Sequence, residues 1–174
     1  MAQLPILVAP DPRLKLKAKP VDGVDDALRR LMDDMLETMY VAPGIGLAAP
    51  QVGVSRRVLV IDIAKEGEPR APLCMANPEL VSVSDDDAVY EEGCLSVPEH
   101  YAEVVRPARV TVRFLDRDGI TRELDADGLL ATVVQHEMDH LDGILFIDHL
   151  SNLKRNMILR KLSKSRKAAT DPAL

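Results

Sequence analysis

Two histidines and a glutamate near residue 140 have the types and the spacing of a metal-binding site. They stand in residues 135–140, which read QHEMDH. If this stretch is helical, His136 and His140 project from one face, one turn from each other. Two neutral imidazoles in that arrangement can bind one divalent metal, and Glu137 beside them could serve as a base toward a water molecule on that metal. The pattern therefore indicates metal-assisted chemistry.

The helix that must carry these residues is itself predicted by the sequence. Asp127 is a candidate N-cap, and Gly143 stands where a C-terminal cap belongs. Apolar residues recur between these limits at helical spacing: Leu129, Leu130, Val133, Val134 and Leu141. The alternative interpretation is a buried helix with two incidental histidines.

No third ligand with a recognised spacing follows the helix. The metzincin pattern requires a histidine where this chain has Phe146, and the gluzincin pattern requires a later glutamate, whereas Glu137 is the last glutamate of the chain. Asp142 and Asp148 fit neither pattern. The third ligand must therefore come from upstream, which argues against most ordinary metalloproteases.

Cys94 is the best upstream candidate. It lies between Gly93 and Leu95 in a stretch with strand character, from which a thiolate could reach a helix packed against the sheet. One cysteine and two histidines leave one position of a tetrahedral ion open, which is typical of a catalytic site. The alternative is a buried, unreactive thiol, which is what we expect of Cys74.

A loop of small residues over 43–53 offers backbone without obstruction. Residues 44–49 formally match the dinucleotide pattern Gly-x-Gly-x-x-Ala, but that site requires a preceding strand and a following helix, and here a helix precedes. Because Gly44 and Gly46 lack side chains, a peptide could pair with the main chain there. Gln51 could then direct its amide at a carbonyl oxygen.

The composition is that of a globular protein with an aliphatic core. Of 174 residues, 47% are hydrophobic and 29% charged, while aromatic residues make up only 3%. No apolar run approaches the length of a membrane span, and residues 1–10 lack the features of a signal peptide. We therefore expect one domain over residues 1–174 and a cytoplasmic location. Two cysteines are too few for a disulfide framework.

The net charge of −6 is unevenly distributed. Residues 151–174 carry seven bases and one acid, whereas residues 1–150 carry 15 bases and 27 acids. We predict a basic helix over 151–167, followed by a flexible tail over 168–174.

The remaining elements have to position the candidate site. We predict an extended arm (4–20), an amphipathic helix (22–40), a buried strand (57–63), two short strands around Asn77 (73–83), a strand-like segment (89–98), and a hairpin (109–115 and 120–124). The order of helix, strands, helix and helix predicts the α+β class. In that fold, short antiparallel or mixed sheets pack around a central HExxH helix.

Three segments resemble, in order, the three motifs of the peptide deformylases: residues 44–51 (GIGLAAPQ), 92–96 (EGCLS) and 135–140 (QHEMDH). The spacing of the motifs and the order of the elements resemble that family over the whole chain. The resemblance implies an enzyme that removes the formyl group from the N-terminal formylmethionine of nascent bacterial chains. It also implies one divalent metal, usually Fe(II), which Ni, Co or Zn can replace.

Roles for individual residues follow from the same resemblance. The metal ligands would be Cys94, His136 and His140. Glu137 would be the general acid and base, and Gln51 with the backbone N–H of Leu95 would bind the oxyanion. The substrate-binding residues would be Gly44, Ile45, Gly46, Gly93, Leu129 and Val133, of which Ile45, Leu129 and Val133 would form an apolar pocket for the methionine side chain.

Two partners are expected on these grounds. Nascent formylmethionyl peptides would be the substrate, and the basic C-terminal helix would hold the enzyme near the ribosomal exit site by phosphate contacts. A solvated helix end is the alternative for that helix, because basic charge also suits its dipole.

Two other functions remain open from the sequence. One is a metallo-aminopeptidase or small protease, which would act on unformylated peptides without a cysteine ligand. The other is a zinc-stabilised binding module whose tail contacts RNA. Release of formate from formyl-Met-Ala separates all three.

Overall fold

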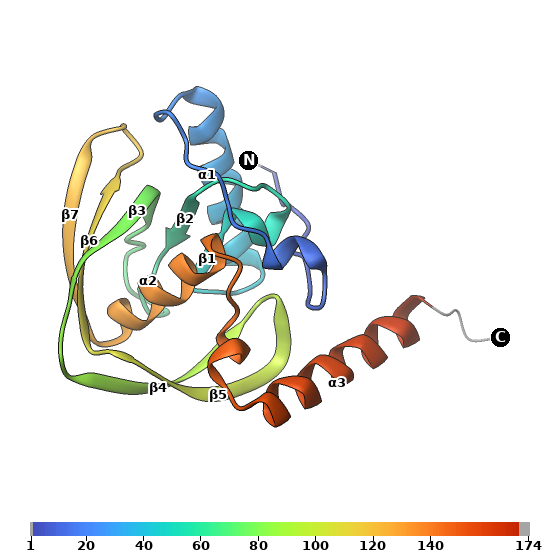
Figure 1. The fold of residues 1–174 in the computed structure, drawn as a ribbon. Coiled ribbons are helices and arrows are strands. Elements are labelled where there is room, and N and C mark those ends of the chain that lie inside the picture. The colour runs from blue at the N-terminus through green and yellow to red at the C-terminus, as the bar shows by residue number, and fades with distance from the viewer. Residues whose placement is uncertain (1, 171–174) are drawn as a thin grey trace.

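The computed structural model describes residues 2–170, with side chains as far as Lys167. Within that range the chain combines helices with antiparallel sheets, so the predicted α+β class is confirmed (Figure 1). The helices are α1 (Asp26–Val41), α2 (Gly128–Leu141) and α3 (Asn152–Thr170). Short 3-10 helices occur at Pro12–Lys15, Ala49–Val52 and Phe146–His149.

The strands form two separate antiparallel sheets. The larger has the order β1-β2-β3-β6-β7, with β1 at one edge. The smaller is the long ribbon of β4 and β5, which curves below the body in Figure 1. The strand bounds are β1 (Gly46–Ala48), β2 (Val58–Ile61), β3 (Leu73–Val83), β4 (Asp87–Cys94), β5 (Val97–Pro107), β6 (Arg109–Leu115) and β7 (Thr121–Asp127).

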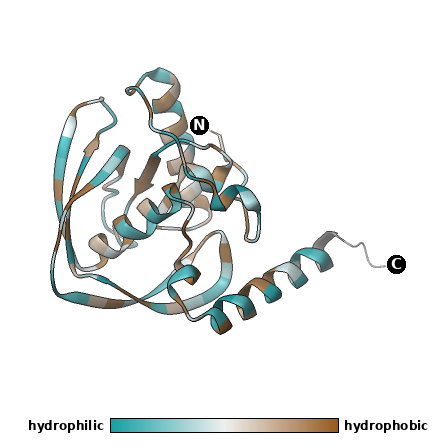
Figure 2. Ribbon diagram, viewed as in Figure 1, coloured by the Kyte–Doolittle hydropathy of each residue, from teal (hydrophilic) through white to brown (hydrophobic). Residues whose placement is uncertain are grey.

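The strand β2 is buried on both faces because a helix covers each of them. Leu59 and Ile61 pack in the core cluster that contains Val134 and Leu141 of α2. Val58 and Val60 belong to the cluster formed with α1, which contributes Leu28, Met32, Met35 and Met39. Successive side chains of a strand point to opposite faces, so the apolar run 58–61 serves both cores. Figure 2 shows β2 as an apolar strand between the two helices.

The helix α1 starts four residues later than the helix predicted from residue 22. Its N-cap is Asp25, whose side chain accepts a hydrogen bond from the Leu28 N–H at 2.8 Å. At the end of α2, Gly143 takes the positive φ of 74° expected after a helix C-terminus. A side chain there would also collide with the Lys15 carbonyl oxygen, 2.4 Å from an added Cβ.

Several sequence-based boundaries were wrong. The two strands predicted over 73–83 are one strand, β3, with a register shift after Ala76. At the shift, Asn77 has a φ of 48° and its amide bonds both backbone groups of Val21, so a distant segment stabilises the irregularity. The predicted loop over 43–53 contains β1, and the segment predicted over 89–98 is the tip of the β4–β5 hairpin. The predicted hairpin over 109–124 is confirmed as β6 and β7.

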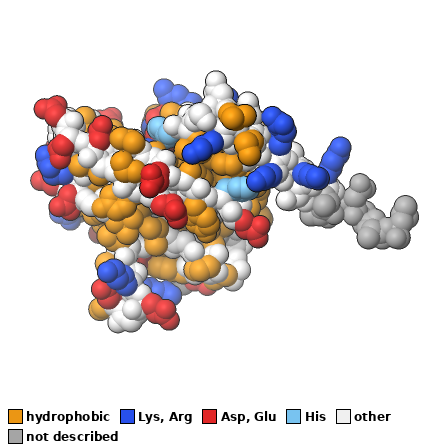
Figure 3. Space-filling view, turned by 90° about the horizontal axis from the view of Figure 1, so that it is seen from below, with side chains coloured by type: hydrophobic (Ala, Val, Ile, Leu, Met, Phe, Trp, Pro, Cys, Tyr) orange, Lys and Arg blue, Asp and Glu red, His pale blue; other side chains and the backbone are white. Residues whose placement is uncertain are grey.

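The helix α3 projects from the body (Figure 1). It is anchored by Leu162, which is buried with Phe146 and Val104 in a third core cluster. The helix continues three residues beyond the predicted end at residue 167, and residues 171–174 of the predicted tail lie outside the described range. In Figure 3, Lys and Arg side chains follow the projecting helix, whereas acidic side chains gather on the body. Between residues 2 and 170, no helix combines the length and apolarity that crossing a membrane requires.

Candidate active site

Three candidate metal ligands from two elements converge in the structure. Cys94 stands at the end of β4, while His136 and His140 lie one turn apart on α2. One ligand atom from each residue lies within 4.8 Å of the others, and the Cys94 Sγ is 3.4 Å from the His140 Nε2. Both imidazoles are buried. One sulfur and two ring nitrogens at this separation form a donor set that a divalent transition metal fits.

The two imidazoles have opposite electrostatic surroundings. Burial lowers the pKa of His140 well below its ordinary value, which favours the neutral ligand form. Burial also opposes the charged form of His136, but hydrogen bonds with Cys94 and Glu92 outweigh it and raise the pKa of His136 well above its ordinary value. Binding of a metal ion would therefore require His136 to lose a proton, because histidine and cysteine ligands bind metals in their deprotonated forms.

A buried ion-pair network supports His136 from behind. The His136 Nδ1 lies 2.8 Å from the Glu92 Oε1, which leaves the Nε2 available toward the ligand cluster. Arg106 donates to both oxygens of Glu92 at 2.7 and 2.9 Å, and to Asp139 at 2.8 Å. Burial would raise the pKa of Glu92, but its hydrogen bonds from His136 and Arg106 hold that pKa at about 2. The Asp139 carboxylate also contacts the His149 Nε2 at 2.8 Å.

Glu137 lies beside the ligand cluster as a buried carboxyl group. Its Oε1 is 4.0 Å from the His136 Nε2, and its Oε2 has no hydrogen-bond partner among residues 2–170. Burial raises the pKa of Glu137 to about 7. Such a group can both accept and donate a proton near neutral pH.

The glycines of the 44–49 stretch make room for side chains of the protein itself. A Cβ at Gly46 would stand 2.6 Å from the Glu137 Oε1, and a Cβ at Gly44 would stand 2.8 Å from the Leu95 Cδ1. The space above these glycines is therefore filled by side chains of the protein itself. A glycine at 46 is what allows β1 to pass directly over Glu137. The expectation that a peptide pairs with the main chain of this stretch stays a prediction, and both glycines line the cavity described below.

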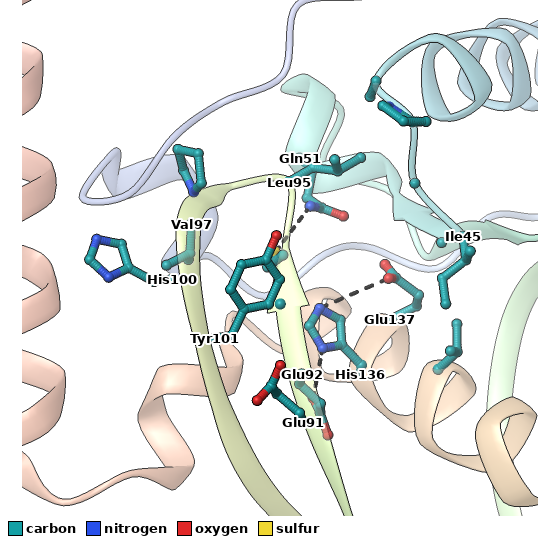
Figure 4. A pocket seen from close by; sticks show the side chains of 18 of the residues that line it. Ile45, Gln51, Glu91, Glu92, Leu95, Val97, His100, Tyr101, His136 and Glu137 are labelled. Atoms are coloured by element: carbon teal, nitrogen blue, oxygen red, sulfur yellow. Dashed lines mark hydrogen bonds and ion pairs between the residues drawn. The ribbon is translucent and has the colours of Figure 1, made fainter.

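The amide of Gln51 is fixed by three contacts. Its Oε1 accepts from the Ala48 N–H at 2.9 Å. Its Nε2 donates to the Ser96 Oγ at 3.1 Å and faces the Cys94 Sγ at 3.5 Å. Figure 4 shows Gln51, His136 and Glu137 directed toward one space, with Leu95 in the turn that follows Cys94.

That space is a cavity of about 690 Å³. All the residues predicted to bind substrate line it, namely Gly44, Ile45, Gly46, Gly93, Leu129 and Val133. Tyr101 also lines it and packs on Gly93, where an added Cβ would stand 2.5 Å from the ring. Cys74 does not line the cavity but lies in the core cluster formed with α1, where burial raises the pKa of its thiol to about 11.

Sequence reasoning missed several residues of this site. Arg106 and Asp139 carry no spacing signal, because the partners of Arg106 lie 14 and 33 residues away in the chain. Glu92 and Ser96 stand inside a recognised motif, so the motif could have drawn attention to them. Phe146, noted only as a missing histidine, stacks on His136 with ring centroids 6.0 Å apart.

Comparisons with known proteins agree on one family. The family model described as polypeptide deformylase matches residues 3–156. The peptide deformylase of Phenylobacterium zucineum is 61% identical over 169 residues, covering 97% of this chain and 100% of the relative. That of Agrobacterium fabrum is 57% identical over 164 residues, covering 94% and 96%.

Solved structures give the same result. The crystal structure of peptide deformylase from Ehrlichia chaffeensis superposes with a TM-score of 0.93 at 40% identity, covering 98% of this chain and 100% of that one. A complex of peptide deformylase from that organism with actinonin gives a TM-score of 0.91 at 43% identity, covering 95% and 98%.

Proposed function

The chain belongs to the peptide deformylase family, metal-dependent hydrolases that remove the N-formyl group from an N-terminal formylmethionine, and we propose how its residues divide that reaction. The reaction adds water across the formyl C–N bond and yields formate and a free methionyl N-terminus. The observation that carries the assignment is the cluster of a thiol and two imidazoles beside an unpartnered buried carboxyl group, at a cavity that Cys94, His136 and Glu137 line.

Cys94, His136 and His140 are the residues that we assign to the metal. Three protein ligands are the number found in catalytic sites, where one further position is left for substrate or water. The helix α2 is the central scaffold in this proposal, since it carries two ligands and the adjacent Glu137. When bound, the ion supplies Lewis acidity, which makes water more acidic and polarises a carbonyl group.

Glu137 moves the proton. As water attacks the formyl carbon, Glu137 takes its proton, and it returns a proton to the amine nitrogen as the C–N bond breaks. A carboxyl group whose pKa is about 7 suits both steps near neutral pH. Its unpartnered Oε2 leaves an oxygen available for the exchange.

Gln51 and Leu95 stabilise the negative charge that develops on the formyl oxygen. The Gln51 Nε2 and the Leu95 backbone N–H donate to that oxygen as the carbon becomes tetrahedral. The amide of Gln51 is already held by Ala48 and Ser96, so little reorganisation is needed when the charge appears.

Ile45, Leu129 and Val133 receive the methionine side chain. Ile45 and Leu129 are each 42% exposed at the cavity, so a bound side chain would bury apolar surface on them. Full burial of a methionine side chain is worth about 1.5–3 kcal/mol. The peptide would extend from Gly44 along β1, the edge strand that begins at Gly46, and past Gly93 across the cavity.

We assign Fe(II) as the ion and the cytoplasm, where nascent chains emerge, as the place of reaction. A mixed thiolate and imidazole set also suits Zn, Ni and Co. Elemental analysis of enzyme purified without oxygen tests the ion. Air should inactivate the iron form faster than a Ni(II)-reconstituted form, because Fe(II) and the thiolate are both oxidisable. Equal decay would contradict the iron assignment.

The basic helix α3 is the proposed ribosome contact. Its exposed bases can neutralise RNA phosphates, with an affinity that falls steeply as salt rises. Because Leu162 anchors α3, the test keeps the helix and changes four exposed bases to glutamine: Lys154, Arg160, Lys161 and Lys164. Cosedimentation with ribosomes at low salt should weaken while peptide turnover is retained. The matched control changes four exposed bases on the body: Lys17, Lys19, Arg56 and Lys65.

Formate release from formyl-Met-Ala tests the function as a whole. The metal-replete enzyme should release formate in proportion to free methionyl amine. Cleavage of unformylated Met-Ala without formate release would identify an aminopeptidase instead.

A further inference from the structure

We propose that Ser96 is a positioning residue that fixes the direction of the Gln51 Nε2 donor, an inference that rests on the proposed role of Gln51 as an oxyanion donor. Ser96 is fully buried, and it lies two residues after Cys94, in the turn between β4 and β5. No step of the reaction above uses its hydroxyl group. Its Oγ nevertheless accepts a hydrogen bond from the Gln51 Nε2 at 3.1 Å.

The contacts of Gln51 allow one orientation of its amide. The Oε1 accepts from the Ala48 N–H, and the Nε2 faces the Ser96 Oγ and the Cys94 Sγ. Rotation by 180° would place the NH₂ group against the Ala48 N–H, donor against donor. It would also turn the carbonyl oxygen toward a cysteine that is a thiolate when it binds metal, acceptor against acceptor.

Ser96 also decides which hydrogen of the amide is left for substrate. The NH₂ group has two hydrogens. The Ser96 Oγ takes one of them, so the other is the one that faces Cys94 and the ligand cluster. A formyl oxygen arriving there meets a donor whose direction is fixed in advance, which is the condition for effective charge stabilisation.

The N-terminal arm holds Gln51 and Ser96 at a constant separation. The Leu7 N–H donates to the Gln51 carbonyl at 2.7 Å, and the Ala9 N–H donates to the Ser96 carbonyl at 2.8 Å. Two residues 45 positions apart in the sequence are thus tied to the same short segment. The side-chain bond between them therefore spans two fixed backbones.

A double-mutant cycle on the metal-replete full chain tests the inference. Gln51→Ala should lower kcat for formyl-Met-Ala by about 10²–10³-fold, the usual cost of one oxyanion donor. Ser96→Ala should lower kcat by about tenfold with KM and metal content unchanged, because Ala48 still holds the amide oxygen. The double variant should equal Gln51→Ala alone, since Ser96 acts only through that amide. If Ser96→Ala does not fold, Ser96→Cys, of similar volume and with a weaker acceptor, takes its place in the cycle.

Thr38→Val is the matched control. The Thr38 hydroxyl is also buried, and it accepts a hydrogen bond from the Leu4 N–H of the N-terminal arm at 2.9 Å, but it does not contact Gln51. This variant should lower the Tm and leave kcat unchanged.

Three outcomes would overturn the inference, and they differ from one another. Additive losses in the double variant would mean that Ser96 acts independently of Gln51. A Thr38→Val enzyme as slow as Ser96→Ala would mean that a looser N-terminal arm, and not the contact with Gln51, explains the loss of kcat. An unchanged kcat in Gln51→Ala would remove the proposed role of Gln51, and the inference with it.

Discussion

Replacing Gly46 with alanine should slow the reaction by moving Glu137 without touching a metal ligand. The added Cβ would stand 2.6 Å from the Glu137 Oε1 and 2.9 Å from its Cδ and Cγ. Ordinary contact begins at 3.4 Å, so the carboxylate must retreat by roughly 0.8 Å. Gly46 has no positive φ, so its backbone can accept alanine and the side-chain collision is the dominant effect.

The expected magnitude follows from that displacement. A misplacement of about 1 Å at a catalytic group costs about 10²-fold in rate. We therefore expect kcat to fall by about 10–100-fold, less than in a variant that lacks the carboxylate altogether. Overpacking costs about 1–3 kcal/mol of unfolding free energy, and the reduced freedom of the unfolded chain offsets about 0.4–1 kcal/mol of this.

The assay measures kcat for formyl-Met-Ala, metal content and Tm on the same preparation. Gly23→Ala is the matched control, since an added Cβ there meets nothing within 4 Å. A Gly46→Ala enzyme with full kcat would refute the close approach of β1 to Glu137. Loss of metal together with activity would show that the displacement reaches the ligands, contrary to the reasoning.

Three further predictions concern the ligands, the base and the buried ion pair. Cys94→Ala should lose metal and activity, whereas Cys74→Ala should keep both, and a metal-replete, active Cys94→Ala enzyme would contradict the ligand assignment. Mass spectrometry should show that iodoacetamide at pH 9 leaves Cys74 unmodified, because this thiol is buried and its pKa is raised to about 11. Glu137→Gln should lower kcat by about 10²–10⁴-fold with metal content unchanged, as elemental analysis can check. Arg106→Met should lower the unfolding free energy by about 3–5 kcal/mol in urea titrations, since it removes the guanidinium that pairs with the buried Glu92 carboxylate and leaves that carboxylate only its contact with His136. In the parent protein the pKa of Glu92 drops on folding from 4.5 to about 2, so the contribution of Glu92 to the unfolding free energy is full above pH 4.5 and is lost as the pH falls toward 2. An unfolding free energy that does not change with pH in that window would contradict the pairing.

The sequence alone determined the features that depend on local spacing. His136 and His140 share a helix face because a helix repeats every 3.6 residues, and α2 spans Gly128–Leu141 as the apolar pattern and Gly143 indicated. The β6–β7 hairpin follows from its turn residues and alternation. Cys94 was reached partly by elimination and partly by its motif, since no spacing rule ties it to a histidine 46 residues away in the chain.

Only the tertiary structure decided how these residues are supported. Arg106 reaches Glu92 and Asp139 from another strand, and the N-terminal arm joins Gln51 to Ser96, so neither contact leaves a periodic signal in the chain. The same holds for β3, which continues past Asn77 because the amide of that residue bonds the backbone of Val21. Gly46 is the sharpest case. The sequence showed a residue without a side chain, but only packing against Glu137 showed what occupies the space, because contact across a fold depends on where whole elements dock and not on neighbouring residues.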